Sequence, residues 1–506
     1  NASSDVDTNH IVSFGNPLAI SANNDVTIRN NATLQTSGHA IVLGNLTGTG
    51  STENYIENAS TSPGSITITQ TTDQTVDVVI RDGVNFFELL PGEVDAALSF
   101  TKAGPAALTL TKGNTFSGST TLSGGTLRLA YDADNSMLSD TAELILNDGI
   151  IDLAGTVSHS EVVLSTTING TVAIERSAGS SILNLNTITR NAGSLRISED
   201  DITTTDNANV NGILGGWATV GGSFATNSGV LDPGTNGGYI RGLATFDQNI
   251  DRLSGGAGTQ LIVDGVTDNV NIQEAGTTAG PITLAAAGTT TIYTLRQGAD
   301  GSTVDGPDGP AVIDIGVGNT LRIASGGVLL PDTSSPLTFN QTGSLTAGAT
   351  DNTAATLFVQ NQSTAGSLLT VGTVISDNGS GIVDVRTTGP GTTVFTGANT
   401  YTGNTLVGSG ILAIGDGGST GTLSSGDVNV EASAVLAFNR SDTALAVPGA
   451  ITGTGNVAQN GSGTTTLSGA APLSSLTFTL ADGTLATGVD GAIHTTGTLV
   501  FGGSAG

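Results

Sequence analysis

The chain has 506 residues, including 73 Gly and no Cys, and its 14 Lys and Arg against 43 Asp and Glu give a net charge of −29. Nucleic acid and anionic lipid are excluded as partners, because both are bound by clustered basic side chains. The lack of Cys excludes disulfides and thiolate metal sites, and no run of about 18 apolar residues predicts membrane insertion.

The sequence starts at Asn1 rather than at Met, with no charged and apolar leader. Either a signal peptide has been removed or the sequence is a fragment, and of the two we favour a mature exported chain with an extracellular or cell-surface location.

Short runs with alternating apolar and polar residues occur along the whole chain. A period of two is typical of strands with one buried face. Between the runs lie NG, DG, GG and SG pairs, which supply positive φ at turns. No window combines a period of 3.6 with helix caps, so an all-β chain is predicted. Clear runs span residues 64–70, 107–111, 126–130, 142–147, 410–415 and 475–480.

One stretch is repeated. Residues 104–127 (GPAALTLTKGNTFSGSTTLSGGTL) align without gaps on residues 389–412, which places Asn114 on Asn399 and Gly118 on Gly403. Residues 461–470 match 389–398 in register. Copies of one unit in an all-β chain favour a parallel β-solenoid over a Greek-key sandwich, with roughly 20 coils of about 20 to 25 residues each.

Five segments are expected along this solenoid. They are N-terminal coils with a cap or docking segment (1–98), coils with the first repeat copy (99–205), coils with a candidate insertion (206–330), coils with the second and third copies (331–470), and a C-terminal coil with a docking strand (471–506).

The repeat resembles a known family. Residues 391–412 (GTTVFTGANTYTGNTLVGSGIL) are similar to the autotransporter-associated β-strand repeat, residues 104–127 are a second copy, and 461–470 are half a copy. The segment at 211–226 is followed by the segment at 321–330 and then by the copy at 389. This succession resembles the order of segments in very large surface proteins with this repeat. The resemblance implies a right-handed parallel β-helix outside a Gram-negative-type cell, acting as an adhesin, a stalk or a secreted passenger.

No residue stands out as catalytic or cofactor-binding. Glu199 and Asp201 would share one face of a strand near Arg196, and glycoside hydrolysis needs such a carboxylate pair, but a solvated acidic turn has the same sequence. We interpret the segment as a turn and the chain as a non-enzyme. The four histidines are isolated in sequence and are expected at the surface: His10, His39, His159 and His494.

Calcium is the one metal for which the sequence offers candidate ligands, because hard cations bind several oxygens from flexible loops. The candidates are Asp132, Asp134, Asp300, Asp305 and Asp308. Their spacing matches neither an EF-hand nor a Gly-rich calcium nonapeptide, so hydrated turns are the competing interpretation.

Three further features have structural interpretations. Trp217 is a candidate sugar platform, but a Trp between Gly pairs more often fills a coil or a cap. Phe116 and Tyr401 share one repeat position and are expected to pack against the next coil. Lys102 and Lys112 are candidates for isopeptide cross-links, with no partner identifiable from sequence.

A solenoid end presents unpaired backbone groups and apolar core, so stacking of copies would extend it. We therefore expect a structural surface protein that self-associates head-to-tail into a filament. The alternative is a monomeric adhesin passenger that binds glycans or other surfaces, and the third candidate is a polysaccharide-degrading β-helix enzyme.

Overall fold

The computed structural model describes residues 10–17, 20–49, 54–83, 96–132, 136–231, 237–250, 260–272, 281–298, 310–469, 476–488 and 498–501. In these ranges the regular structure consists of strands β1 to β48. None of these residues forms a helix that could cross a membrane.

The chain divides into two compact units. Unit 1 contains residues 1–208 and 226–241, and unit 2 contains residues 209–225 and 242–506. The chain therefore passes from unit 1 to unit 2, returns to unit 1, and enters unit 2 again.

The strands up to β23 make up unit 1 and the crossing region. They are β1 (His10–Ser13), β2 (Val26–Arg29), β3 (Ala32–Gln35), β4 (Ala40–Leu43), β5 (Leu46–Thr49), β6 (Tyr55–Glu57), β7 (Gly64–Thr69), β8 (Gln74–Val76), β9 (Val79–Arg81), β10 (Leu98–Ala103), β11 (Ala107–Leu110), β12 (Thr120–Tyr131), β13 (Glu143–Gly155), β14 (Ser160–Val162), β15 (Ser165–Ile168), β16 (Thr171–Arg176), β17 (Ile182–Asn184), β18 (Thr187–Arg190), β19 (Ser194–Ile197), β20 (Thr203–Thr205), β21 (Ala218–Val220), β22 (Ser223–Leu231) and β23 (Gly238–Gly242).

The remaining strands belong to unit 2. They are β24 (Gln248–Ile250), β25 (Leu261–Ile262), β26 (Gly265–Ile272), β27 (Ile282–Leu284), β28 (Thr289–Gln297), β29 (Ala311–Asp314), β30 (Thr320–Leu330), β31 (Leu337–Phe339), β32 (Ser344–Ala347), β33 (Ala355–Asn361), β34 (Leu369–Val371), β35 (Val374–Ile375), β36 (Val383–Thr388), β37 (Thr392–Phe395), β38 (Thr405–Val407), β39 (Gly410–Ile414), β40 (Val428–Val430), β41 (Ala434–Phe438), β42 (Leu445–Val447), β43 (Ile451–Gly453), β44 (Asn456–Gln459), β45 (Thr464–Leu467), β46 (Thr477–Leu480), β47 (Thr484–Thr487) and β48 (Thr498–Phe501).

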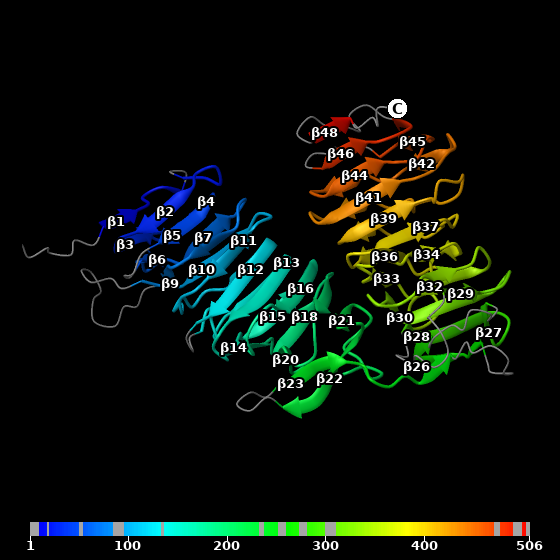
Figure 1. The fold of residues 1–506 in the computed structure, drawn as a ribbon, viewed down its shortest axis with the longest axis horizontal. Coiled ribbons are helices and arrows are strands. Elements are labelled where there is room, and N and C mark those ends of the chain that lie inside the picture. Colours follow the sequence, from blue (N-terminus) through cyan, green and yellow to red (C-terminus); the bar gives the residue numbers. More distant parts are fainter. Residues whose placement is uncertain are drawn as a thin grey trace, which may run out of the picture. The chain divides into compact units, whose positions relative to one another are not determined.

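Both units are parallel β-solenoids, as predicted, with about 18 turns in all. In unit 2 one sheet runs β25-β27-β29-β31-β34-β37-β39-β41-β44-β46-β48, so each strand pairs with the equivalent strand of the next coil (Figure 1). Antiparallel pairing occurs where the chain crosses between the units, at β20–β23 and β21–β22.

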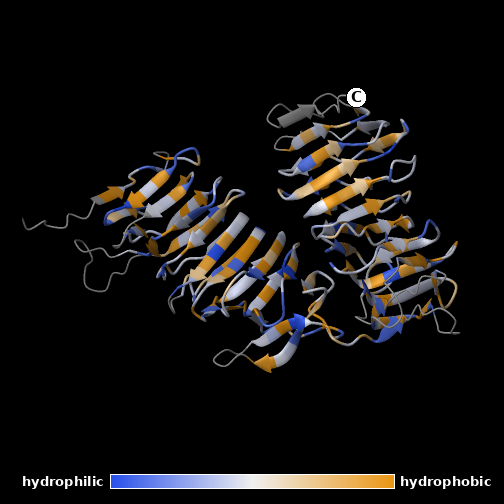
Figure 2. Cartoon of the chain, viewed as in Figure 1, coloured by the Kyte–Doolittle hydropathy of each residue, from blue (hydrophilic) through white to orange (hydrophobic). Residues whose placement is uncertain are grey.

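The core of unit 2 is a column of inward-facing apolar side chains. Val371, Phe395, Ile414 and Phe438 occupy one register position on successive coils and are fully buried. The alternation of apolar and polar residues along each strand produces this column, and the colours in Figure 2 alternate accordingly. Each such aromatic or aliphatic side chain contributes about 1.5 to 3 kcal/mol by its burial.

Candidate functional site

The repeat asparagine joins three coils. Asn399 Oδ1 accepts the backbone N–H of Ile375 from the preceding coil at 2.9 Å, and its Nδ2 donates to the carbonyl of Thr422 in the following coil at 2.7 Å. Asn114 repeats this arrangement, with 2.8 Å to Ile80 N and 2.9 Å to Met137 O. The gapless alignment of the two copies therefore reflects one shared hydrogen-bonding role.

The aromatic position of the repeat is internal. Phe116 and Tyr401 are 3% and 1% exposed. The ring of Phe116 packs edge-on against Phe100, and the Tyr401 hydroxyl lies 2.7 Å from Thr405 Oγ1. Packing within the coil therefore accounts for the aromatic position.

The repeat glycine lies against the preceding coil. A Cβ at Gly403 would lie 2.4 Å from the carbonyl oxygen of Val383, and one at Gly118 would lie 2.5 Å from that of Leu98. Only a residue without a side chain fits such a close approach of two backbones.

Outside each aligned copy, an aspartate accepts hydrogen bonds from two backbone N–H groups. We name it the corner aspartate, and it was not identified from the sequence. Asp377 Oδ1 accepts the backbone N–H of Val383 at 2.9 Å and of Thr402 at 3.0 Å. Asp82 does the same for Leu98 and Ser117, at 2.8 and 3.0 Å. Partial burial opposes ionisation of Asp377, but the hydrogen bonds from Thr402 and Val383 prevail and lower its pKa.

We expect Asp377→Ala to destabilise unit 2 by about 1 to 2 kcal/mol at pH 7, comparable to the loss of a helix cap. Because the folded-state pKa is lowered, this carboxylate stabilises the fold above its unfolded-state pKa, and the contribution is lost as pH falls through the lower folded-state value. Chemical denaturation of both proteins at pH 7 and at about pH 3 measures the difference, since Asp groups titrate near pH 3.9 when unperturbed. A difference that stays constant between the two pH values would contradict this role.

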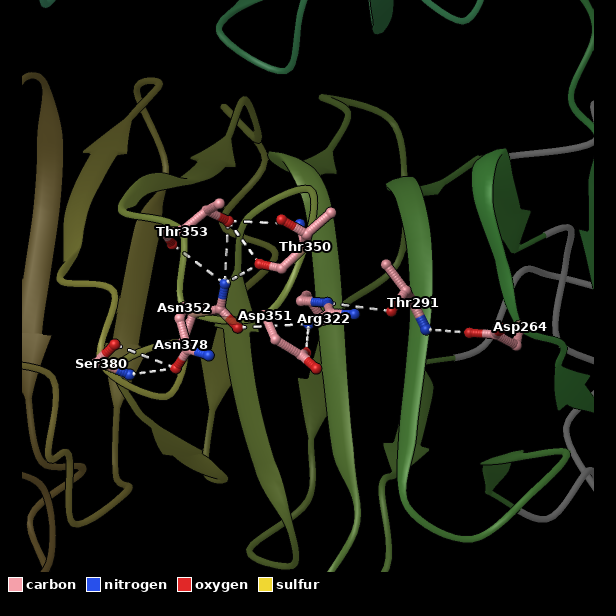
Figure 3. Close-up of polar contacts among 9 residues, drawn as sticks. All are labelled: Asp264, Thr291, Arg322, Thr350, Asp351, Asn352, Thr353, Asn378 and Ser380. Atoms are coloured by element: carbon pink, nitrogen blue, oxygen red, sulfur yellow. Dashed lines mark hydrogen bonds and ion pairs between the residues drawn. The ribbon is translucent and has the colours of Figure 1, made fainter.

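A cluster of polar side chains and loops lies on the side of unit 2 (Figure 3). Arg322 of β30 donates from Nε to Thr291 Oγ1 at 3.1 Å and pairs with Asp351. Its side chain is 13% exposed, whereas that of Asp351 is 80% exposed. Arg322 therefore holds this loop through Asp351, whose side chain is largely in solvent.

Two loops of successive coils stack here, and we name residues 348–354 and 376–382 the lateral loop cluster. Asn378 Nδ2 donates to the carbonyl of Thr350 at 2.7 Å, and Ser380 N donates to Asn352 Oδ1 at 2.8 Å. Ile382, at the end of the cluster, is 52% exposed. The cluster therefore combines loops that are hydrogen-bonded to each other with one exposed apolar side chain.

The acidic turn at 199–201 contains no free carboxylate pair. Glu199 Oε1 lies 2.7 Å from Arg176, and Asp201 makes hydrogen bonds of 2.6 and 2.9 Å with Arg241. Each carboxylate is therefore held by a different arginine.

Calcium candidates are mostly outside the described residues, where Asp134, Asp300, Asp305 and Asp308 lie. Asp132 is described and exposed. Within the described ranges no three His, Cys, Asp or Glu side chains group to hold a metal ion.

One histidine was wrongly expected at the surface. The side chain of His159 is 10% exposed, its ring stacks on Tyr131 with centroids 4.9 Å apart, and its Nε2 lies 3.8 Å from Glu161 Oε2. Glu161 is fully buried and accepts hydrogen bonds from the Tyr131 hydroxyl and from Met137 N, both at 2.8 Å. Burial raises the pKa of Glu161 despite these bonds. His39 is half-buried, His10 lies in β1, and His494 is outside the described residues.

The two lysines differ in environment. Lys102 is fully buried and its Nζ donates to the carbonyls of Ala103, Gly104 and Gly124, each at 2.9 Å. Lys112 is half exposed and pairs with Asp77 at 3.0 Å. The three hydrogen bonds of the Lys102 ammonium go to backbone carbonyl oxygens, which gives this lysine a structural role.

The comparisons with known proteins agree with this architecture. The model of the passenger-associated-transport-repeat family matches residues 100–129 and 386–414, which overlap the two aligned copies. A curated protein of Brucella suis biovar 1 (strain 1330), "Adhesin BmaC autotransporter", is 30% identical over 375 residues. That match covers 72% of this chain and 10% of the adhesin, so the chain spans about a tenth of the length of this relative.

No solved structure matches the chain. The repeat asparagine and glycine make equivalent contacts in both copies matched by the family model, and the aromatic position is buried in both. Residues 100–129 and 386–414 therefore carry passenger-associated-transport repeats, and the chain is similar to part of an autotransporter adhesin.

Proposed function

We propose that the chain is a solenoid segment of a cell-surface adhesin, in which the coils form a scaffold and the lateral loop cluster contacts another surface. The observation that carries the proposal is the stacked pair of loops fixed by Arg322, with Ile382 exposed at its edge. The relative named as an adhesin supports an adhesive role.

Adhesion is tested with the purified chain on glycan arrays and on immobilised host cells, with Ile382→Ser compared against Val317→Ser. Val317 is 88% exposed and lies outside the lateral loop cluster, so it is a matched control. We expect about a tenfold loss of binding for Ile382→Ser alone, typical of one contact residue worth 1.4 kcal/mol. Equal binding by both variants, or binding by neither parent nor variant, would overturn the proposal.

Head-to-tail assembly into a filament stays a prediction. It depends on the general tendency of an uncovered coil to pair with another strand. Electron microscopy over a range of concentrations tests it, because particles that stay the same length at every concentration would exclude growth by stacking.

A further inference from the structure

Residues 209–225, which we name the arm, fold back onto unit 2 far along the sequence. The arm begins with a two-residue Asn-Gly turn, in which Asn211 and Gly212 have φ of 48° and 83° between Val210 and Ile213. A second tight turn at Gly221 and Gly222 joins β21 to β22. These turns shape the arm as a compact hairpin.

The arm occupies one face of β28, β30 and β33. Ile213 and Phe224 are fully buried against Tyr293 and Leu329. At Gly216 the two backbones touch, since a Cβ on Gly327 would lie 2.8 Å from the Gly216 Cα. The fit is therefore close enough to reject side chains at both glycines.

Side chains of the solenoid hold the arm by its backbone and by one hydroxyl. Gln360 Nε2 donates to the carbonyl of Gly216 at 2.9 Å, and Gln362 Nε2 donates to Thr219 Oγ1 at 2.8 Å. Arg296 Nε donates to the carbonyl of Gly222 at 2.7 Å. These contacts lie outside the parallel ladders, so releasing the arm leaves the hydrogen bonds between coils intact.

The chain order around the arm is unusual. Residues 1–208 before it and 226–241 after it belong to unit 1, whereas the arm itself belongs to unit 2. Because the arm is bound to unit 2 by side-chain contacts outside the parallel ladders, the arm of a second molecule can make the same contacts at the equivalent face.

We propose that the arm-binding face of β28, β30 and β33 also accepts the arm of a second copy of this chain, so that exchange of residues 209–225 links two molecules. We identify the arm of a second copy as the occupant of this face, because the face already binds the same residues within one chain. The exchange is independent of the lateral loop cluster and needs no stacking of coil ends.

Cysteine pairs test the exchange, since the natural chain has no Cys. Thr219→Cys is placed in one copy and Gln362→Cys in another, the two are refolded together, and a short bis-maleimide bridges cysteines that come close. We expect at least about tenfold more cross-linked dimer than with Thr219→Cys and Val317→Cys, because docking raises the local concentration of the paired thiols. Circular dichroism and melting temperature verify that every variant is folded.

A second measurement uses the unmodified chain. Refolding at increasing concentration should give a growing dimer fraction by light scattering, with the fluorescence of Trp217 unchanged between monomer and dimer because its surroundings are the same. Cross-linking equal to that of the control pair, together with a monomer at all concentrations, would overturn the exchange. Dimer formation does not depend on Ile382, so its outcome is separable from that of the adhesion test.

Discussion

Replacing Asn399 by Ala is expected to destabilise unit 2 by about 2 to 4 kcal/mol, because it leaves the N–H of Ile375 and the carbonyl of Thr422 without their partner inside the protein. Asn399 is itself only 9% exposed, so water has little access to the two groups. Urea denaturation followed by circular dichroism measures the loss. Asn114→Ala should show a similar loss in unit 1, where the same two bonds are made.

Asn460→Ala is the matched control, since Asn460 is exposed and an exposed substitution usually changes stability by less than about 0.5 kcal/mol. Asn399→Asp separates the two bonds, because the carboxylate keeps the acceptor for Ile375 N but has no donor for Thr422 O. A loss for Asn399→Ala no larger than that for Asn460→Ala would refute the bridging role.

The coil architecture could be predicted from the sequence because its determinants are local and periodic. Alternation within each strand defines the buried face, and the gapless match of 104–127 with 389–412 reproduces the equivalent contacts of Asn114 and Asn399. What is repeated in the sequence is therefore repeated in the hydrogen bonds.

The corner aspartates could not be found in this way. Asp377 lies six residues before Val383, whereas Asp82 lies sixteen residues before its equivalent partner Leu98. A gapless alignment fails when the spacing differs, although the geometry at both corners is the same. A search for an Asp at variable distance before each repeat copy would have detected them.

Contacts between distant segments were also missed. The turns of the arm were visible as Asn-Gly and Gly-Gly pairs, but nothing in residues 209–225 identifies Gln360 and Gln362 as their partners. Likewise, His159 is isolated in sequence because Tyr131 belongs to another coil. Such contacts depend on how coils stack, which local patterns do not encode.

Replacing Lys102 by Met is expected to destabilise unit 1 by about 3 kcal/mol at pH 7, since it leaves one buried and two part-buried carbonyls without this donor while keeping most of the volume. Lys112→Met is the control and should cost less than about 1 kcal/mol, because its ion pair is exposed. Guanidinium or urea melts of the three proteins give the differences.

The pH dependence of this difference distinguishes a buried ammonium from simple packing. Burial lowers the pKa of Lys102 to about 8, against 10.5 for a free lysine, although Asp73 opposes the shift. Between these two values the unfolded chain binds more protons than the folded one, so stability rises with pH there. The natural protein should therefore gain about 2 kcal/mol over Lys102→Met between pH 7 and about pH 9.5. If the difference between the two proteins does not change over that range, Lys102 keeps its proton in the folded chain and burial does not lower its pKa.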